Sequence, residues 1–137
     1  MRYLLAPLVA WSICQVAKVT LTSLQQRRLN LRVLAETGGM PSSHSAIVMG
    51  LTTAIGKYSG LNSPQFAIAL IFSFVVMYDA AGLRRAAGRQ AAVLNRLVED
   101  LMHMRGVQEP VLRELLGHTP VEVLVGAVIG VAVGLIL

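Results

Sequence analysis

The sequence Thr37-Gly38-Gly39-Met40-Pro41-Ser42-Ser43-His44-Ser45 stands where a basic segment gives way to an apolar one. Its two glycines permit backbone angles that other residues avoid, and Pro41 fixes a turn. The apolar run from Ala46 to Ile55 follows directly, so the pattern predicts a loop that opens a helix, with serine oxygens near the amides of its first turn. Unpaired N–H groups and the dipole at such a helix start favour an anion, and His44 exchanges a proton near neutral pH. We therefore expect an anion-binding site here.

The composition is that of a small helical membrane protein. Of the 137 residues, 55% are apolar and only 14% are charged, against about 25% charged in a typical soluble domain. The length suffices for one domain, so we expect a single all-α bundle over residues 1–137. A very hydrophobic soluble bundle is the alternative that composition leaves open. The single cysteine, Cys14, lies in an apolar stretch and is expected to be a buried thiol.

The charge is basic, and its distribution predicts partners and topology. The chain has 12 basic and 7 acidic residues, a formal charge of +5. Without interleaved aromatic residues, such basic segments favour phosphate groups or anionic lipid over nucleic acid. Nine of the 12 basic residues lie in two segments, after the first and the third expected spans: Arg27, Arg28, Arg32, Arg84, Arg85, Arg89, Arg96, Arg105 and Arg113. The positive-inside rule places both segments in the cytoplasm and both termini outside.

The apolar segments predict about four membrane spans plus an amphipathic helix. We expect spans over about residues 3–24, 43–57, 64–81 and 120–137, of which the second is short, because a span needs roughly 20 residues. A basic loop is expected from Gly82 to Gln90, and the spacing of apolar residues over Ala91 to Met104 predicts the amphipathic helix. Gly126, Gly130 and Gly134 form a row that permits close helix packing, and such glycine-rich faces are compatible with a homo-oligomer.

This topology brings the starts of the second and fourth spans to one face. Ser42–Ser45 and His118–Glu122 would then meet, with the Arg84–Arg89 cluster beside them. Glu122 follows His118 by four residues, so its carboxylate can reach the imidazole, hold one tautomer and stabilise the charged ring. Thr119-Pro120-Val121-Glu122 is also a capping box with proline at the first helical position, and both roles can hold at once.

A phosphate ester bound at this face would meet serine hydroxyls, backbone amides and guanidinium groups. One histidine could attack phosphorus while the other protonates the leaving oxygen. The plainer alternative is that both histidines are polar caps at the membrane interface. His44, His118, Asp79 and Glu122 have no recognisable metal-ligand spacing, so we expect neither a metal nor another cofactor.

The sequence allows two interpretations each for Lys18 and Asp79. Lys18 either snorkels outward to the interface or faces the interior of the bundle. Asp79 either forms a structural ion pair with Arg84 and Arg85 or belongs to the active site.

Two motifs resemble those of a known superfamily. Pro41-Ser42-Ser43-His44 resembles the Pro-Ser-Gly-His motif of the type 2 phosphatidic acid phosphatase and vanadium haloperoxidase superfamily. His118-x-x-x-Glu122-Val123-x-x-Gly126-x-x-x-Gly130 resembles its last motif, which has aspartate where Glu122 stands. The fuller pattern is similar to a divergent membrane branch of the superfamily and covers nearly the whole chain. It comprises Thr37 to Ser45, Met77 to Gly82, Arg84-Arg85, Gly88 to Ala91, Leu94-Asn95 and Leu115 to Pro120.

The resemblance implies a phosphatidic acid phosphatase-like helical bundle and a set of roles. His118 would be the nucleophile that forms a phosphohistidine, and Glu122 would orient it. His44 would be the general acid, and Ser42 and Ser43 would lie at the phosphate.

Besides glutamate at position 122, the sequence departs from the superfamily at three places. The Lys-x6-Arg-Pro motif is not intact, because Lys18 is followed seven residues later by Gln25. Arg113 lies five residues before His118 rather than six, and Ser43 replaces the glycine. We expect Arg84, Arg85 and Arg89, together with Lys18, to supply the phosphate contacts.

Two functions from different classes fit this pattern. The first is an enzyme, a phosphoric ester hydrolase that cleaves a lipid-linked phosphate monoester or diphosphate without metal. The second is a non-catalytic membrane protein that binds or moves an anionic headgroup, or supports a partner, in a decayed phosphatase scaffold. The broken first motif favours the second, and a turnover assay separates the two.

Overall fold

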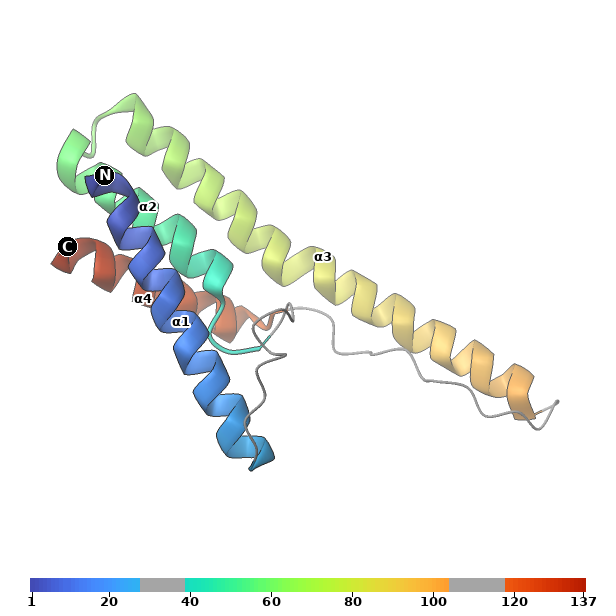
Figure 1. Cartoon of the computed structure of the whole chain (residues 1–137). Helices are drawn as coiled ribbons and strands as arrows, with labels where there is room; N and C mark the ends of the chain where they lie inside the picture. The colour runs from blue at the N-terminus through green and yellow to red at the C-terminus, as the bar shows by residue number, and fades with distance from the viewer. Residues whose placement is uncertain (28–38, 104–117) are drawn as a thin grey trace.

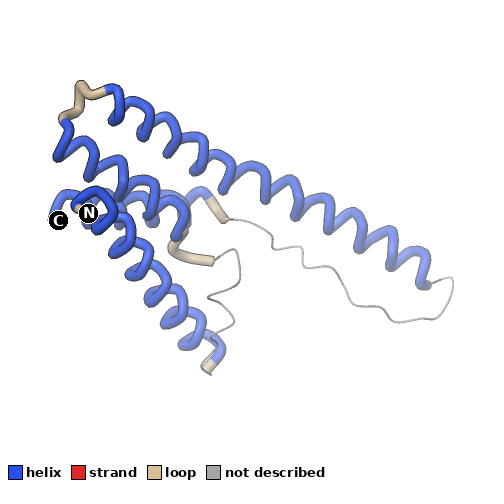
Figure 2. The backbone as a smooth tube through the Cα atoms, turned by 45° about the horizontal axis from the view of Figure 1, so that its top comes forward, coloured by secondary structure: helices blue, strands red, loops and turns tan. Residues whose placement is uncertain are grey.

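The computed structural model describes residues 1–27, 39–103 and 118–137, and this part of the chain is all-helical (Figures 1 and 2). Its helices are α1 (Arg2–Gln26), α2 (Ser43–Ser59), α3 (Pro64–His103) and α4 (Pro120–Ile136). α2 packs against each of the other three and so forms the centre of the bundle. The predicted all-α class is confirmed. The segment 104–117, which includes Arg105 and Arg113, lies outside the described residues, as do Arg28 and Arg32.

The outer faces of the bundle suit lipid. α1 and the Pro64–Gly82 part of α3 are long and apolar enough to cross a membrane. α2 and α4 have 17 residues each, or about 25 Å at 1.5 Å per residue, a little less than the roughly 30 Å hydrocarbon core. Large apolar side chains are exposed on the outside of α1, α3 and α4, among them Leu8, Val16, Ile68, Ile71, Leu124 and Val128. Lipid covers such surfaces without the cost that water imposes.

The predicted break between the third span and the amphipathic helix is wrong. α3 runs without interruption from Pro64 to His103 and extends beyond the other three helices (Figure 1). A glycine inside a helix costs only about 1 kcal/mol relative to alanine, and the alanines around Gly82 and Gly88 are strong helix formers. The expected amphipathic segment is therefore the C-terminal part of α3, where Leu94, Leu97 and Leu101 are exposed.

The core is built from small residues. Ala6, Ala10, Cys14, Ala46 and Ala54 are buried where α1, α2 and α4 meet. The predicted packing role of the glycine row is confirmed by the closest approaches along α4. A Cβ atom placed on Gly130 would lie 2.5 Å from the carbonyl oxygen of Ala46, and one on Gly134 would lie 2.6 Å from Cβ of Thr53. Small residues thus let the helix backbones touch.

Two buried hydroxyls fasten α2 to α3. The Thr52 and Ser73 oxygens are 2.7 Å apart. Each also lies within hydrogen-bond distance of the carbonyl oxygens of Val48 and Ala69, at 2.8 to 3.2 Å. Because lipid offers no competing partners, this hydroxyl pair stabilises the seam between the two helices.

Replacing Thr52 by valine, which keeps the volume but removes the hydroxyl, is expected to destabilise the protein by about 1 kcal/mol. The measurement is thermal unfolding in detergent. Ser12→Ala is the control, because the Ser12 hydroxyl is exposed and donates to Leu8 O of its own helix, at 2.9 Å, rather than to another helix. Equal losses in the two variants would contradict the stabilising role of the Thr52–Ser73 pair.

The two ends of the bundle carry different groups: the chain termini and two tyrosines lie at one end, and the starts of α2 and α4 lie at the other (Figure 1). At one end the rings of Tyr3 and Tyr58 meet edge to face, with centroids 5.8 Å apart. There Tyr58 donates to Leu137 O at 2.5 Å and Lys57 donates to Leu135 O at 3.0 Å. Both chain termini lie at this end, and the starts of α2 and α4 lie away from it (Figure 1). The predicted arrangement, with the two helix starts on one face, is confirmed.

Candidate functional site

The start of α2 is capped by serine, as the sequence predicts. The preceding loop turns at Gly39, whose φ of +85° favours glycine, and the Met40–Pro41 peptide is cis. Ser42 is the N-cap, and its Oγ accepts from the backbone N of Ser45 at 3.4 Å and from the Ser45 hydroxyl at 3.1 Å. Both serines are fully buried. The loop is thereby fixed to the first turn of the helix.

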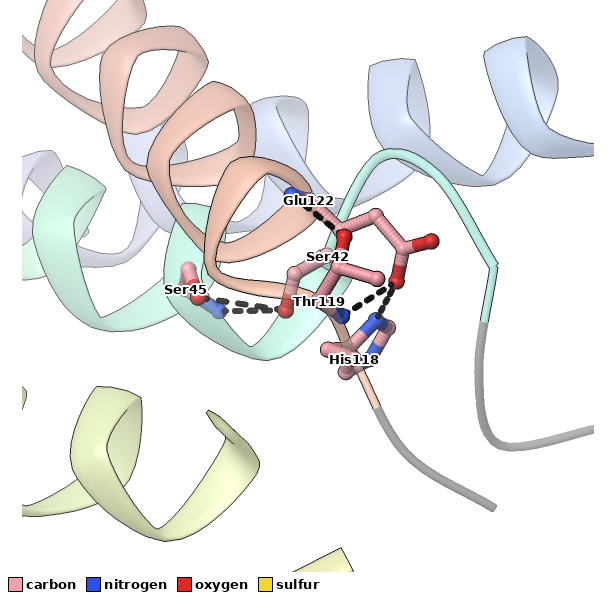
Figure 3. A network of polar contacts seen from close by, with 5 residues as sticks. All are labelled: Ser42, Ser45, His118, Thr119 and Glu122. Atoms are coloured by element: carbon pink, nitrogen blue, oxygen red, sulfur yellow. Dashed lines mark hydrogen bonds and ion pairs between the residues drawn. The ribbon is translucent and has the colours of Figure 1, made fainter. Parts of the chain in front are cut away.

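The start of α4 has the predicted capping box. Glu122 N donates to Thr119 Oγ1 at 3.3 Å, and Thr119 N donates to Glu122 Oε2 at 3.1 Å. The same carboxylate oxygen lies 3.1 Å from Nδ1 of His118 (Figure 3). Glu122 therefore caps α4 and holds His118 at the same time. The sequence allows both of these roles.

This contact defines the chemistry of His118. The residue is only 3% exposed, and its Nδ1 faces a carboxylate, which accepts hydrogen bonds and donates none when ionised. Nδ1 therefore carries the hydrogen, and in the neutral ring the lone pair belongs to Nε2. A histidine held in this way has an oriented, nucleophilic Nε2, and the carboxylate stabilises the ring when it becomes charged.

The two histidines lie together although they are far apart in sequence. The ring centroids of His44 and His118 are 6.3 Å apart, at an interplanar angle of 67°. A backbone hydrogen bond joins the two helix starts, from Ser42 N to Glu122 O at 3.1 Å. The N-terminal ends of α2 and α4 thus meet at one place (Figure 3). Their positive dipole ends act together there and favour an anion.

Lys18 faces the interior of the bundle rather than the interface. It is 7% exposed. Its Cε would lie 3.3 Å from a Cβ placed on Gly39, so the side chain packs against the loop that precedes α2. Of its two interpretations, the interior one holds. A basic side chain of α1 accordingly lies behind the loop of the site.

The other predicted site residues fall in three groups. Ser43, at the first position of α2, is half-buried and contributes to a turn whose amides lack intrahelical acceptors. Asp79 is exposed on α3, and within the described residues no hydrogen bond or ion pair joins it to either histidine. Of Arg84, Arg85 and Arg89 the structure describes only the backbone, within α3, so their approach to phosphate stays a prediction. Arg113 lies outside the described ranges.

The sequence interpretation missed the backbone link between Ser42 and Glu122. The signal that points to it is Gly126, one helical turn after Glu122, against which Ser42 packs directly. Among residues 1–27, 39–103 and 118–137, no group of three or more histidine, cysteine, aspartate or glutamate side chains converges as metal ligands would.

The comparisons with known proteins agree with the motifs. The chain matches the Divergent PAP2 family over residues 1–133. It is 40% identical over 145 residues to the "Uncharacterized membrane protein YuiD" of Bacillus subtilis (strain 168), and the alignment covers 98% of this chain and 92% of that protein. No solved structure matches the chain. Because the family match and the relative both span nearly the whole length, the protein is a membrane protein of the Divergent PAP2 family.

Proposed function

We propose that this protein is a membrane phosphatase that hydrolyses a lipid-linked phosphate monoester or diphosphate through a phosphohistidine at His118. The observation that carries the proposal is the pair of imidazoles 6.3 Å apart, one of them held through Nδ1 by a carboxylate. Rings with centroids this close can both contact one phosphoryl group bound beside them.

The proposed reaction has two steps. In the first, Nε2 of His118 attacks phosphorus, the bond from phosphorus to the leaving oxygen breaks, and His44 donates a proton to that oxygen. In the second, His44 removes a proton from water as the water attacks the phosphohistidine. The phosphorus–nitrogen bond breaks, phosphate is released and His118 is restored. Glu122 stabilises the charged ring of His118 throughout.

Several positive groups support phosphate as the ligand. The amino ends of α2 and α4 converge at the two histidines, and Lys18 lies behind the loop before α2. Fixed dipoles and charges of this kind stabilise the charge that develops on phosphoryl oxygens. Arg84, Arg85 and Arg89 are proposed to add guanidinium contacts, which match phosphate oxygens two at a time.

The surface beside the site supports a lipid-linked substrate. Val121, Leu124 and Val128 are exposed on α4, and Val121 directly precedes Glu122 in the chain. They form an apolar strip that begins at the site and runs along the helix. An acyl or prenyl chain that packs on this strip would keep its phosphate at the starts of the two helices.

The proposal is tested with purified protein in detergent and a panel of lipid phosphates and diphosphates. At least one of them is expected to release inorganic phosphate with the wild type and none with the His44→Ala/His118→Ala double variant. Equal release by the two proteins would refute the assignment of the site, and absence of release from every substrate would refute the activity.

A non-catalytic role is the second candidate, and Gln25 is the residue that favours it. The superfamily motif has arginine seven residues after its lysine, whereas Lys18 is followed at that distance by Gln25. A protein that only binds or moves an anionic headgroup would bind lipid phosphate through the same dipoles without turnover. Saturable binding without phosphate release would favour this candidate.

The positive-inside rule further leads us to propose that the site faces the cytoplasm. Single cysteines introduced in a Cys14→Ala background test this with an impermeant thiol reagent. Met40→Cys reports the loop before α2, and Ser59→Cys reports the opposite end of the bundle, since both positions are exposed. In intact cells Ser59→Cys is expected to react at least about tenfold faster, and permeabilisation should remove the difference. Faster reaction of Met40→Cys in intact cells would contradict this orientation.

A further inference from the structure

Among the glycines along α4, Gly126 leaves the least space for a side chain, and the neighbour that fills this space is Ser42, the N-cap of α2. A Cβ atom placed on Gly126 would lie 2.1 Å from the carbonyl oxygen of Ser42, 3.0 Å from its carbonyl carbon and 3.2 Å from its Cβ. The obstructing atoms belong largely to the backbone, which cannot rotate away as the end of a side chain can. Any side chain at this position would therefore move the start of α2 relative to α4.

Ser42 is held to α4 by a second contact one turn earlier. Its backbone N donates to Glu122 O at 3.1 Å, and Glu122 and Gly126 are four residues apart and so lie on one face of the helix. The Ser42 N–H therefore donates to the carbonyl oxygen of Glu122, and the Ser42 carbonyl oxygen lies against Gly126. We call this pair of contacts the Ser42 clamp.

The Ser42 clamp connects the two halves of the site. Ser42 is the N-cap of α2, two residues before His44, and Glu122 is the residue that holds His118. A shift of Ser42 relative to α4 therefore changes the distance between the two imidazoles. The His118–Glu122 contact stays in place, because both of its residues lie at the start of α4 and neither belongs to α2.

We propose that Gly126 is a positioning residue that sets the separation of His44 and His118 through the Ser42 clamp. The effect of this separation on catalysis rests on the proposed phosphatase function. The claim that Gly126 sets the distance between the two imidazoles does not depend on that function. Gly82 of α3 is the matched control, because the nearest atom to a Cβ placed there is Cε1 of Tyr78 in the same helix, at 3.9 Å. Gly130 does not serve as a control, because a Cβ there would lie 2.5 Å from Ala46 O and would also displace α2.

The direct test measures the separation without reference to activity. His44→Cys and His118→Cys are combined in a Cys14→Ala background, and the rate of cross-linking by a short bifunctional thiol reagent is measured in membranes. Adding Gly126→Ala is expected to slow cross-linking at least about tenfold, whereas Gly82→Ala should change it less than about twofold. Equal slowing by both substitutions, or by neither, would overturn the proposal.

A second pair of variants covers the case in which Gly126→Ala does not fold. Ser42→Pro removes the N–H that Glu122 O accepts, and the φ of −73° at Ser42 suits proline. Ser42→Ala removes the capping hydroxyl but keeps the N–H. Slower cross-linking in Ser42→Pro than in Ser42→Ala supports the clamp, and equal rates in these two variants contradict it.

Activity separates this proposal from the proposed function. In the protein with both histidines, Gly126→Ala is expected to lower kcat at least about tenfold more than Gly82→Ala does, with similar KM in the two variants. An inactive wild type whose cysteine derivatives still follow the expected order would refute the phosphatase and leave the positioning role standing. An active enzyme in which the two glycine variants lose kcat equally would refute the positioning role alone.

Discussion

His118→Ala is expected to lower the rate of lipid phosphate hydrolysis at least about a thousandfold. The variant has no Nε2 to attack phosphorus, and the carboxylate of Glu122 loses the ring that it holds at 3.1 Å. The remaining groups, among them the two helix dipoles and Lys18, still favour phosphate but form no covalent intermediate. Release of inorganic phosphate in detergent micelles measures the loss, and thermal unfolding shows whether the bundle persists.

His103→Ala is the matched control for this substitution. His103 is the last residue of α3, and that end of the helix lies away from the starts of α2 and α4 in both views of the backbone (Figures 1 and 2). We expect it to keep the wild-type rate within about twofold. A folded His118→Ala protein that hydrolyses lipid phosphate at the same rate as His103→Ala would contradict a phosphohistidine intermediate at His118.

Glu122→Gln is expected to lower kcat by about 10² to 10⁴ with little change in stability. Glutamine at the third position of a helix also completes a capping box, so the structural role of the residue is kept. What is lost is the negative charge that orients His118 and stabilises its charged ring. Steady-state kinetics and thermal unfolding of the same preparation separate the two roles.

Thr119→Ala is the complementary control, because it removes the cap and keeps the charge. Without Thr119 Oγ1, which accepts from Glu122 N at 3.3 Å, α4 is expected to lose about 1 kcal/mol of stability and the protein to keep most of its rate. If Glu122→Gln instead behaved like Thr119→Ala, with lower stability and an unchanged kcat, Glu122 would be a helix cap and nothing more.

The helical elements could be predicted largely because the signals are local. Ser42 before an apolar run and Thr119-Pro120 before another predict the starts of α2 and α4, where the structure has them. The continuity of α3 could not be predicted in the same way. Gly82 and Gly88 are each unfavourable in a helix, and whether a helix passes through them depends on the sum over the flanking alanines rather than on either glycine.

The candidate site was predictable in its parts and less so in its geometry. Helix direction and connectivity suffice to bring His44 and His118 to one end of the bundle, and the four-residue spacing suffices to join His118 to Glu122. The Ser42 clamp was less predictable. Gly126 indicates a close approach at this level of α4, but the backbone hydrogen bond itself depends on how the two segments approach each other. Lys18 kept two interpretations for a related reason: it lies in α1, well before its last residue Gln26, and a long lysine side chain there can reach either inward or toward the interface.

The most direct measurement of a shared phosphoryl-transfer site uses inorganic phosphate labelled with oxygen-18. Attack of His118 on phosphate, with His44 donating a proton to the departing oxygen, forms a phosphohistidine and releases one labelled oxygen as water. Hydrolysis of that intermediate then returns phosphate with an oxygen from the solvent. The wild type is predicted to replace the label well above the rate in buffer, and His44→Ala and His118→Ala are each predicted to lose at least about a hundredfold of that exchange. A wild type that leaves the label in place, or a His118→Ala variant that exchanges it as fast as the wild type, would contradict the account.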